Sequence, residues 1–309
     1  MKKFLINLIS IGCILFVLSL GYYFLCKKTL NKYGMSTAKQ IQLQYKNLYT
    51  VKDSVTTIVF GNSRLYRGIN PYKLSGYAYN MSHDNDTYNQ IYYKIVQAIA
   101  ECPNLHTIII GYDFFQFSFL SDTRNYVYCQ YLPDEYLKDY SFSFIPISVQ
   151  PYMHFVRNNK SYFDQFLKAL LNKESKARLS ARGQYTYESK ATPNDTVKRN
   201  SNILPVQDFY FNKITSLLGN TKYDVFFVTM PIRDNEYNCY TIETIDCFRE
   251  KIEKICSSYK NIKYIDESRN KNFIDYKLYT DITHFNSQTA DIYTQHLDSI
   301  INKTLFARK

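Results

Sequence analysis

The sequence lacks clustered positive charge. Its 38 lysines and arginines outnumber 27 acidic residues and give a formal charge of +11, but no five of them stand in a row. Proteins that bind nucleic acid concentrate positive charge along one face or one helix. The dispersed lysines therefore exclude a nucleic-acid-binding function and favour an ordinary solvated basic surface, while a peripheral contact with an anionic lipid or polymer stays open.

Metal-binding and disulfide patterns are also missing. Neither a His-Glu-x-x-His nor a Cys-x-x-Cys occurs, so we predict no metal and no other cofactor. Of seven cysteines, Cys13 and Cys26 lie in an apolar stretch, and the other five are widely spaced. Because five cannot all pair, we expect one or two disulfides at most, and buried free thiols otherwise. No internal repeat recurs at a fixed period, which excludes a repeat architecture.

Charge is absent from a long stretch near the start. Phe4 to Cys26 contain no charged residue, and about 20 apolar residues suffice to cross a bilayer. The stretch is longer than the apolar region of a secretory signal and no Ala-x-Ala site precedes Lys27, so we predict an uncleaved membrane anchor over residues 1–28 and a polar stem over 29–52. Lysines flank the stretch on both sides, so charge alone does not decide its orientation.

A serine follows the first predicted strand. Thr57 to Phe60 are four consecutive β-branched or aromatic residues, which is typical of a strand buried on both faces. Gly61 comes next, and we expect it to adopt a backbone conformation closed to other residues. Ser63 would then project from a tight turn beyond the carboxyl edge of the sheet, where open α/β folds bind their ligands.

Strand and helix patterns alternate along much of the chain. The predicted strands are 57–60, 78–81, 106–111, 223–229 and 262–265, and the predicted helices are 88–103, 206–218, 241–258 and 286–301. Alternation of this kind is typical of parallel strands joined by right-handed crossovers. We therefore predict an α/β fold.

The middle of the chain interrupts this alternation. Residues 119–204 are dense in Phe and Tyr at first and polar later, and we interpret them as a cap inserted between two parts of one α/β core, 53–118 and 205–309. Within the cap, Tyr162 to Leu179 has helical spacing, and Ala181 to Asn202 is predicted to be a loop.

An acid and a histidine stand three residues apart near the other end of the chain. A serine hydroxyl attacks a carbonyl only if a base takes its proton, and His284 could be that base. Asp281 could hold the other ring nitrogen and stabilise the imidazolium. Ser63, Asp281 and His284 thus form a possible catalytic triad; alternatively, Asp281 caps a turn and His284 is an ordinary surface residue.

The two patterns together resemble the SGNH/GDSL hydrolase superfamily. Its first block is a strand followed by Gly-Asp/Asn-Ser, matched by Gly61-Asn62-Ser63, and its last block is Asp-x-x-His, matched by Asp281 to His284. Ser63-Arg64, Gly68-Ile69-Asn70-Pro71 and the Tyr79-Asn80 pair are similar to the membrane-anchored branch associated with cell-envelope polymer acylation.

This resemblance implies a fold and a function. The fold would be a flavodoxin-like three-layer parallel sheet carrying a cap and an N-terminal transmembrane helix. The protein would be a serine esterase or O-acyltransferase on the outer side of the cytoplasmic membrane, with its amino end in the cytoplasm. Its partners would be a cell-envelope polysaccharide or acylated polymer and a membrane acyl-donating protein.

The oxyanion hole departs from the family pattern. The superfamily uses an asparagine amide from a Gly-x-Asn-Asp block, whereas this chain reads Gly111-Tyr112-Asp113. An ionised Asp113 accepts hydrogen bonds and cannot donate one. We expect the Ser63 N–H and the Asn80 amide to replace it. If they do not, the alternative is a catalytically impaired binding or assembly component of an envelope polymer modification system.

Arg64 has two interpretations. Its guanidinium could form a salt bridge within the loop, or it could bind a carboxylate or phosphate on an anionic polymer. The second interpretation makes Arg64 the predicted substrate-binding residue.

Overall fold

The computed structural model describes residues 1–32, 36–141, 143–171 and 177–307, and the chain divides into two units. The first unit comprises Met1–Leu43 and Asp122–Ser175, and the second comprises Gln44–Ser121 and Lys176–Lys309. The predicted cap, 119–204, is therefore divided between them.

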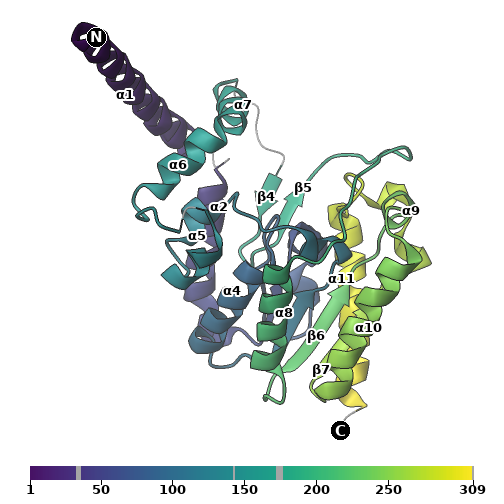
Figure 1. The fold of residues 1–309 in the computed structure, drawn as a ribbon. Coiled ribbons are helices and arrows are strands. Elements are labelled where there is room, and N and C mark those ends of the chain that lie inside the picture. Colours follow the sequence, from purple (N-terminus) through teal and green to yellow (C-terminus); the bar gives the residue numbers. More distant parts are fainter. Residues whose placement is uncertain (33–35, 142, 172–176, 308–309) are drawn as a thin grey trace. The chain divides into compact units, whose positions relative to one another are not determined.

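The first unit is helical. Its helices are α1 (Lys2–Lys32), the first half of α2 (Thr37–Val51), α5 (Asn125–Tyr128), α6 (Gln150–Arg157) and α7 (Asn159–Leu170). α1 is long and apolar enough to cross a membrane. α6 and α7 lie against the carboxyl-terminal part of α1 (Figure 1). Aromatic side chains make this contact, and Tyr23, Cys26 and Phe155 form its buried centre.

The second unit is built on a parallel sheet. Its strands are β1 (Thr57–Phe60), β2 (Ala78–Asn80), β3 (Thr107–Gly111), β6 (Asp224–Thr229) and β7 (Ile262–Asp266). The order is β2-β1-β3-β6-β7 and every pairing is parallel. This order agrees with a flavodoxin-like fold, in which the strand order reverses between the first and third strands and ligands bind at that switch point. The predicted strands and the α/β class are therefore present.

Helices cover both faces of this sheet (Figure 1). They are α3 (Ser63–Gly68), α4 (Tyr88–Glu101), α8 (Pro205–Leu218), α10 (Ile242–Ser258) and α11 (Ser287–Phe306). The short helix α9 (Asp234–Tyr237) follows the carboxyl end of β6. α3 and α11 share a buried cluster with one face, where Val59 of β1 and Ile109 of β3 are fully buried. On the other face, Phe211 of α8 contacts Phe227 of β6, and α4 packs beside α8.

A short hairpin corrects two predictions. β4 (Ala177–Leu179) pairs antiparallel with β5 (Tyr185–Tyr187). The helix predicted over 162–179 ends at Leu170 among the described residues, and the loop predicted over 181–202 contains β5. Strands of three residues are too short to carry a recognisable alternation, so sequence periodicity missed them.

Candidate active site

Ser63 stands at the junction of β1 and α3. All four residues of β1 are buried. Asn62 caps α3, because its side-chain Oδ1 accepts a hydrogen bond from the Arg64 backbone N–H at 2.9 Å. Ser63 is the first residue of the helix, so its own N–H has no partner within the helix. The serine thus lies at the carboxyl edge of the sheet, beside the switch point between β1 and β3.

Gly61 has a different role from the one expected. Positive φ occurs at Gly76 and Gly183 and not at Gly61, so the expected special backbone conformation is wrong. A Cβ on Gly61 would lie 3.1 to 3.3 Å from atoms of the Leu65 side chain. The glycine therefore leaves room for α3 to pack closely on the turn.

A short, well-bonded loop carries the acid and the histidine. An antiparallel bridge between Tyr279 and Phe285 closes it. Within it, Asp281 Oδ1 accepts hydrogen bonds from the backbone N–H groups of Thr283 at 2.7 Å and His284 at 2.9 Å. Arg233 donates to the backbone carbonyl of Asp281 at 3.3 Å. These bonds fix the conformation of the loop immediately before α11.

The three predicted catalytic side chains meet. His284 Nε2 lies 2.7 Å from Ser63 Oγ, and His284 Nδ1 lies 2.7 Å from Asp281 Oδ2. A carboxylate only accepts, so Nδ1 carries the proton and Nε2 is left as an acceptor for the serine hydroxyl. The arrangement can pass a proton from Ser63 to His284 while Asp281 holds the ring.

Electrostatics keep this histidine neutral near pH 7. Burial lowers the pKa of His284, and the nearby Arg67 guanidinium lowers it further, although the hydrogen bond to Asp281 acts in the opposite direction. Burial alone would raise the pKa of Asp281, but the hydrogen bonds from His284 and the loop backbone hold it well below its usual range. The pair is therefore a neutral imidazole beside an ionised carboxylate, as general base action requires.

Arg67 is a site residue that sequence reasoning missed. Its Nη1 lies 3.2 Å from His284 Nδ1, and its Nη2 donates to both carboxylate oxygens of Asp84 at 3.1 and 3.2 Å. Because Nδ1 already donates to Asp281, Arg67 contributes a nearby positive charge and not a hydrogen bond. Its position four residues after Ser63, on the same face of α3, was the available signal.

Arg64 is not available to a substrate. Its side chain is 1% exposed, with Nε 3.2 Å from Asp113 Oδ1 and Nη2 2.5 Å from Glu236 Oε1. The predicted substrate-binding role is therefore wrong, and the salt-bridge interpretation holds. Burying an unpaired guanidinium at this position would cost desolvation free energy, and the ion pairs with the two carboxylates offset that cost.

Arg64 belongs to a buried ionic network that continues toward the acid–histidine loop. Burial would raise the pKa of Glu236, but Arg64 and Arg199 together lower it, so it is ionised. Arg199 forms an ion pair with Glu236 and donates to Thr283 Oγ1 at 2.9 Å. The network thus joins the serine turn to the loop that carries His284.

Asp113 follows the carboxyl end of β3, beside the serine turn. Its side chain is buried, accepts a hydrogen bond from Asn62 Nδ2 at 2.7 Å and pairs with Arg64. Burial raises its pKa, while Arg64 and Asn62 oppose that effect. Asp113 therefore braces the serine turn.

Asn80 also has a structural role. Its side-chain Nδ2 donates to the backbone carbonyls of Leu65 at 2.9 Å and Ile69 at 3.1 Å, and its Oδ1 accepts from the Ser82 N–H. Both amide hydrogens are thus engaged, so this conformation leaves none for a substrate oxygen and does not support the predicted oxyanion role. The Ser63 N–H, at the first position of α3, has no partner within the helix and stays a predicted oxyanion donor.

Other candidate chemistry is sparse in the described part of the chain. No group of three or more His, Cys, Asp or Glu among those residues could hold a metal ion. The seven cysteines are all free thiols.

Comparison with known proteins yields a distant structural match. No protein-family model matches the chain, and no curated protein does either. Solved structures do match, among them "The structure of a putative platelet activating factor from Streptococcus pneumonia", with 9% sequence identity and a TM-score of 0.39 over 84% of this chain and 92% of that one.

Proposed function

We propose that the protein is a serine-dependent esterase or O-acyltransferase of the SGNH/GDSL type. The observation that carries the proposal is the distance of 2.7 Å between His284 Nε2 and Ser63 Oγ, combined with the hydrogen bond from His284 Nδ1 to Asp281. A hydroxyl, an imidazole and a carboxylate in this order are the groups needed for acyl transfer through a serine.

The chemistry follows from these positions. Ser63 Oγ attacks the carbonyl carbon of an ester while its proton moves to His284 Nε2. The carbon–oxygen bond to the alcohol then breaks, and Nε2 returns the proton to the leaving oxygen, which leaves an acyl group on Ser63. Water or a sugar hydroxyl next attacks the acyl carbon while its proton moves to His284 Nε2; the bond from that carbon to Ser63 Oγ then breaks, and Nε2 returns the proton to Ser63 Oγ. Asp281 stabilises the imidazolium in both halves.

The oxyanion hole limits the rate in this proposal. The Ser63 N–H is one donor, and neither Asp113 nor Asn80 offers another in this conformation. Loss of one donor typically costs roughly 10²- to 10³-fold in turnover. Fast turnover therefore requires a second hydrogen-bond donor that moves into place when the acyl substrate binds. Without it, we expect a slow enzyme or one that acts on a single substrate.

A fluorophosphonate probe tests this proposal. The full chain in isolated membranes, treated with the probe, will be labelled, because the probe reacts with a serine whose proton a base removes. Ser63→Ala and His284→Ala will lose the label, whereas Ser257→Ala, which changes an exposed serine on α10, will keep it. Labelling that persists in Ser63→Ala would refute the role of this serine.

The second candidate function is a binding or assembly component without turnover. The buried Asp113 favours it, because a carboxylate paired with Arg64 stands where an oxyanion donor is expected. No labelling of a folded chain at any pH between 6 and 9 would favour this second function.

Substrate class and location complete the proposal. We take the substrate to be an acyl ester on a cell-envelope polysaccharide or related polymer, with a membrane acyl-donating protein as partner, because of the motif resemblance. α1 would anchor the chain in the cytoplasmic membrane with the second unit outside. A carboxyl-terminal reporter that is active only outside the cytoplasm tests the orientation, and activity solely in the cytoplasmic form would reverse it.

A further inference from the structure

The continuously exposed part of α1 is shorter than the hydrocarbon core of a membrane is thick. Every residue from Met1 to Leu18 is exposed, whereas Tyr23, Cys26 and Leu30 are buried. Phe4 to Leu18 are about 15 residues, or roughly 22 Å of helix, and the hydrocarbon core of a bilayer is about 30 Å thick. The segment packed by α6 and α7 must therefore begin within the membrane if α1 spans it.

The packed segment has the composition of a membrane interface. Tyr22 and Tyr23 of α1 contact aromatic rings of α6 and α7, namely Tyr152, Phe155 and Phe166. The Tyr152 hydroxyl donates to Ser19 Oγ at 2.8 Å. Tyrosines are enriched where hydrocarbon meets water, because their rings are apolar and their hydroxyls polar.

α7 has more apolar surface than α1 covers. Tyr162, Phe166 and Ala169 lie on the side packed in the first unit, and Ala169 is 1% exposed. Beside this face lies a second apolar strip, defined here as the outer strip of α7, whose side chains are 40 to 67% exposed: Phe163, Leu167, Leu170 and Leu171. Their spacing of three and four residues puts them on one side of the helix.

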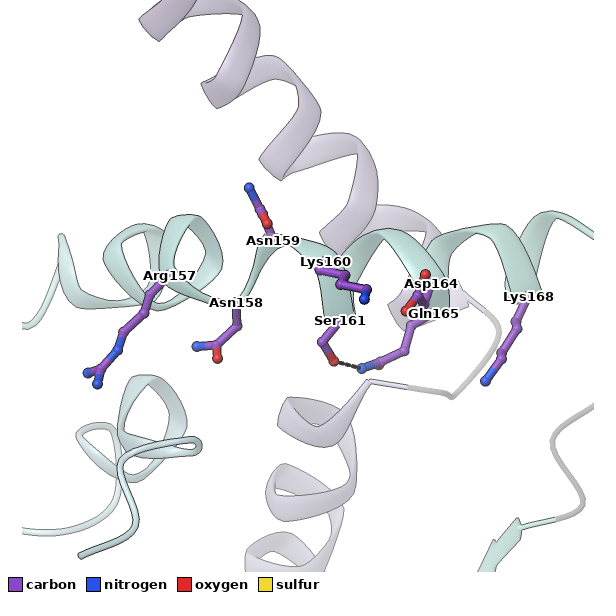
Figure 2. Close-up of a pocket in the computed structure, with 8 residues that line it drawn as sticks. All are labelled: Arg157, Asn158, Asn159, Lys160, Ser161, Asp164, Gln165 and Lys168. Atoms are coloured by element: carbon purple, nitrogen blue, oxygen red, sulfur yellow. Dashed lines mark hydrogen bonds between the residues drawn. The ribbon is translucent and has the colours of Figure 1, made fainter.

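Polar side chains occupy the opposite side of α7. Figure 2 shows a hollow lined by residues of α6 and α7, where Ser161, Gln165 and Lys168 point the same way and Gln165 Nε2 donates to Ser161 Oγ at 3.1 Å. Arg157, Lys160 and Asp164 also line this hollow, and the spacing of Lys160 and Asp164 puts them at its border with the outer strip. α7 therefore carries an exposed apolar side and an exposed charged side, as helices that lie in a membrane interface do.

We propose that α6 and α7 form an interfacial collar around α1, with the outer strip of α7 inserted into the lipid and the hollow facing water. This inference rests on the membrane-anchoring part of the proposed function. It adds that the chain contacts the bilayer through a second, sequence-distant element. Lipid is the occupant we name, because α7 packs directly on α1, the helix that is long and apolar enough to cross a membrane.

Tryptophan fluorescence tests the collar, because the chain contains no tryptophan and each substitution provides a single probe. The full chain carrying Phe163→Trp is reconstituted into phosphatidylcholine–phosphatidylglycerol vesicles. A nitroxide on the upper acyl chain of the lipid will quench this tryptophan several-fold more than aqueous iodide does. In the matched control Ser161→Trp, two residues away and on the polar side, iodide will be the stronger quencher.

Three outcomes would overturn the collar, and the first two concern the quenching of the tryptophan. Iodide could quench Phe163→Trp as strongly as Ser161→Trp, which would place the strip in water. Neither quencher could reach Phe163→Trp, which would mean that a second copy or another protein covers it. If Phe163→Trp fails to fold, Leu170→Trp gives the same readout on the same strip.

The third outcome concerns the anchor itself. Loss of the full chain from vesicles in an alkaline wash would show that α1 does not insert, and the collar would fail with it. Fluorophosphonate labelling of Ser63 is measured on the same samples, so a failure of the catalytic proposal is recognised separately.

Discussion

Arg67 Nη1 lies 3.2 Å from His284 Nδ1, so a cation stands beside the base that faces Ser63. Arg67 is also paired with Asp84, and the two side chains are 18% and 24% exposed. A positive charge at this distance disfavours the imidazolium and thereby lowers the pKa of His284, in addition to the larger effect of burial.

The first prediction concerns the pH dependence of labelling. A base acts only when neutral, and the pKa of His284 is lowered in the folded protein, so labelling of Ser63 will be complete at neutral pH and will fall only below about pH 6.5, the ordinary value. Arg67→Gln removes one cause of the lowered pKa. The acid limb of the pH–rate profile will therefore move to higher pH.

The control for this prediction is Arg249→Gln, which removes an exposed arginine on α10. Its profile will match that of the unaltered protein. An acid limb that stays in place or moves to lower pH in Arg67→Gln would contradict the assigned role.

The second prediction concerns Asp281→Asn. The variant keeps the size of the side chain but removes the negative charge that holds Nδ1–H, and in established triads such a change costs about 10⁴-fold in rate. The second-order rate constant for fluorophosphonate labelling will fall by a similar factor. A fall of less than tenfold would show that Asp281 only shapes the loop.

The lowered pKa of Asp281 also leads us to predict that the stability of the fold depends on pH. Its pKa is lowered in the folded state, so its contribution is fully present above the unfolded value of about 3.9 and is lost as pH falls below it. The difference in denaturant midpoint between the unaltered protein and Asp281→Asn will therefore shrink between pH 6 and pH 3. A constant difference would mean that the charge does not stabilise the fold.

The third prediction concerns the buried network. Arg64→Met leaves the carboxylates of Asp113 and Glu236 without their shared cation, and breaking a buried pair in this way typically costs about 3–5 kcal/mol. The free energy of unfolding, measured with urea, will fall by that amount. Arg269→Met removes an exposed pair with Asp234 and will change it by less than about 1 kcal/mol.

The fourth prediction concerns the link between the network and the loop. Arg199→Lys keeps the charge, but a single ammonium cannot bridge Glu236 and Thr283 as the guanidinium does. The labelling rate will fall by at least several-fold with little change in stability. Lys198→Met, an exposed neighbour, is the control and will leave the rate unchanged; equal effects of both would refute the link.

Local sequence patterns predict most of the sheet. Runs such as Thr57–Phe60 and Thr107–Gly111 are apolar throughout because both faces of the sheet are covered, and that signal does not depend on distant residues. The two motifs likewise predict that Ser63 and His284 lie close together, because both residues are on loops at the same edge of a parallel sheet.

Long-range contacts account for what the sequence did not predict. From the sequence, Arg64 could either bind substrate or form a salt bridge. The choice depends on the position of Glu236, which stands 172 residues later in the sequence. The contacts of Arg199 depend in the same way on Glu236 and Thr283. The association of α6 and α7 with α1 was also not predicted, because helical spacing within a segment does not say which distant element its apolar side packs against.

The burial of Tyr23, Cys26 and Leu30 has a practical consequence for making this protein. Truncation just before Leu30, a common way to obtain a soluble fragment, would strip Phe155 and its aromatic neighbours of their cover. Such a fragment would be prone to aggregate for a reason unrelated to its chemistry. Detergent-solubilised, untruncated material is the form in which the serine is best assayed.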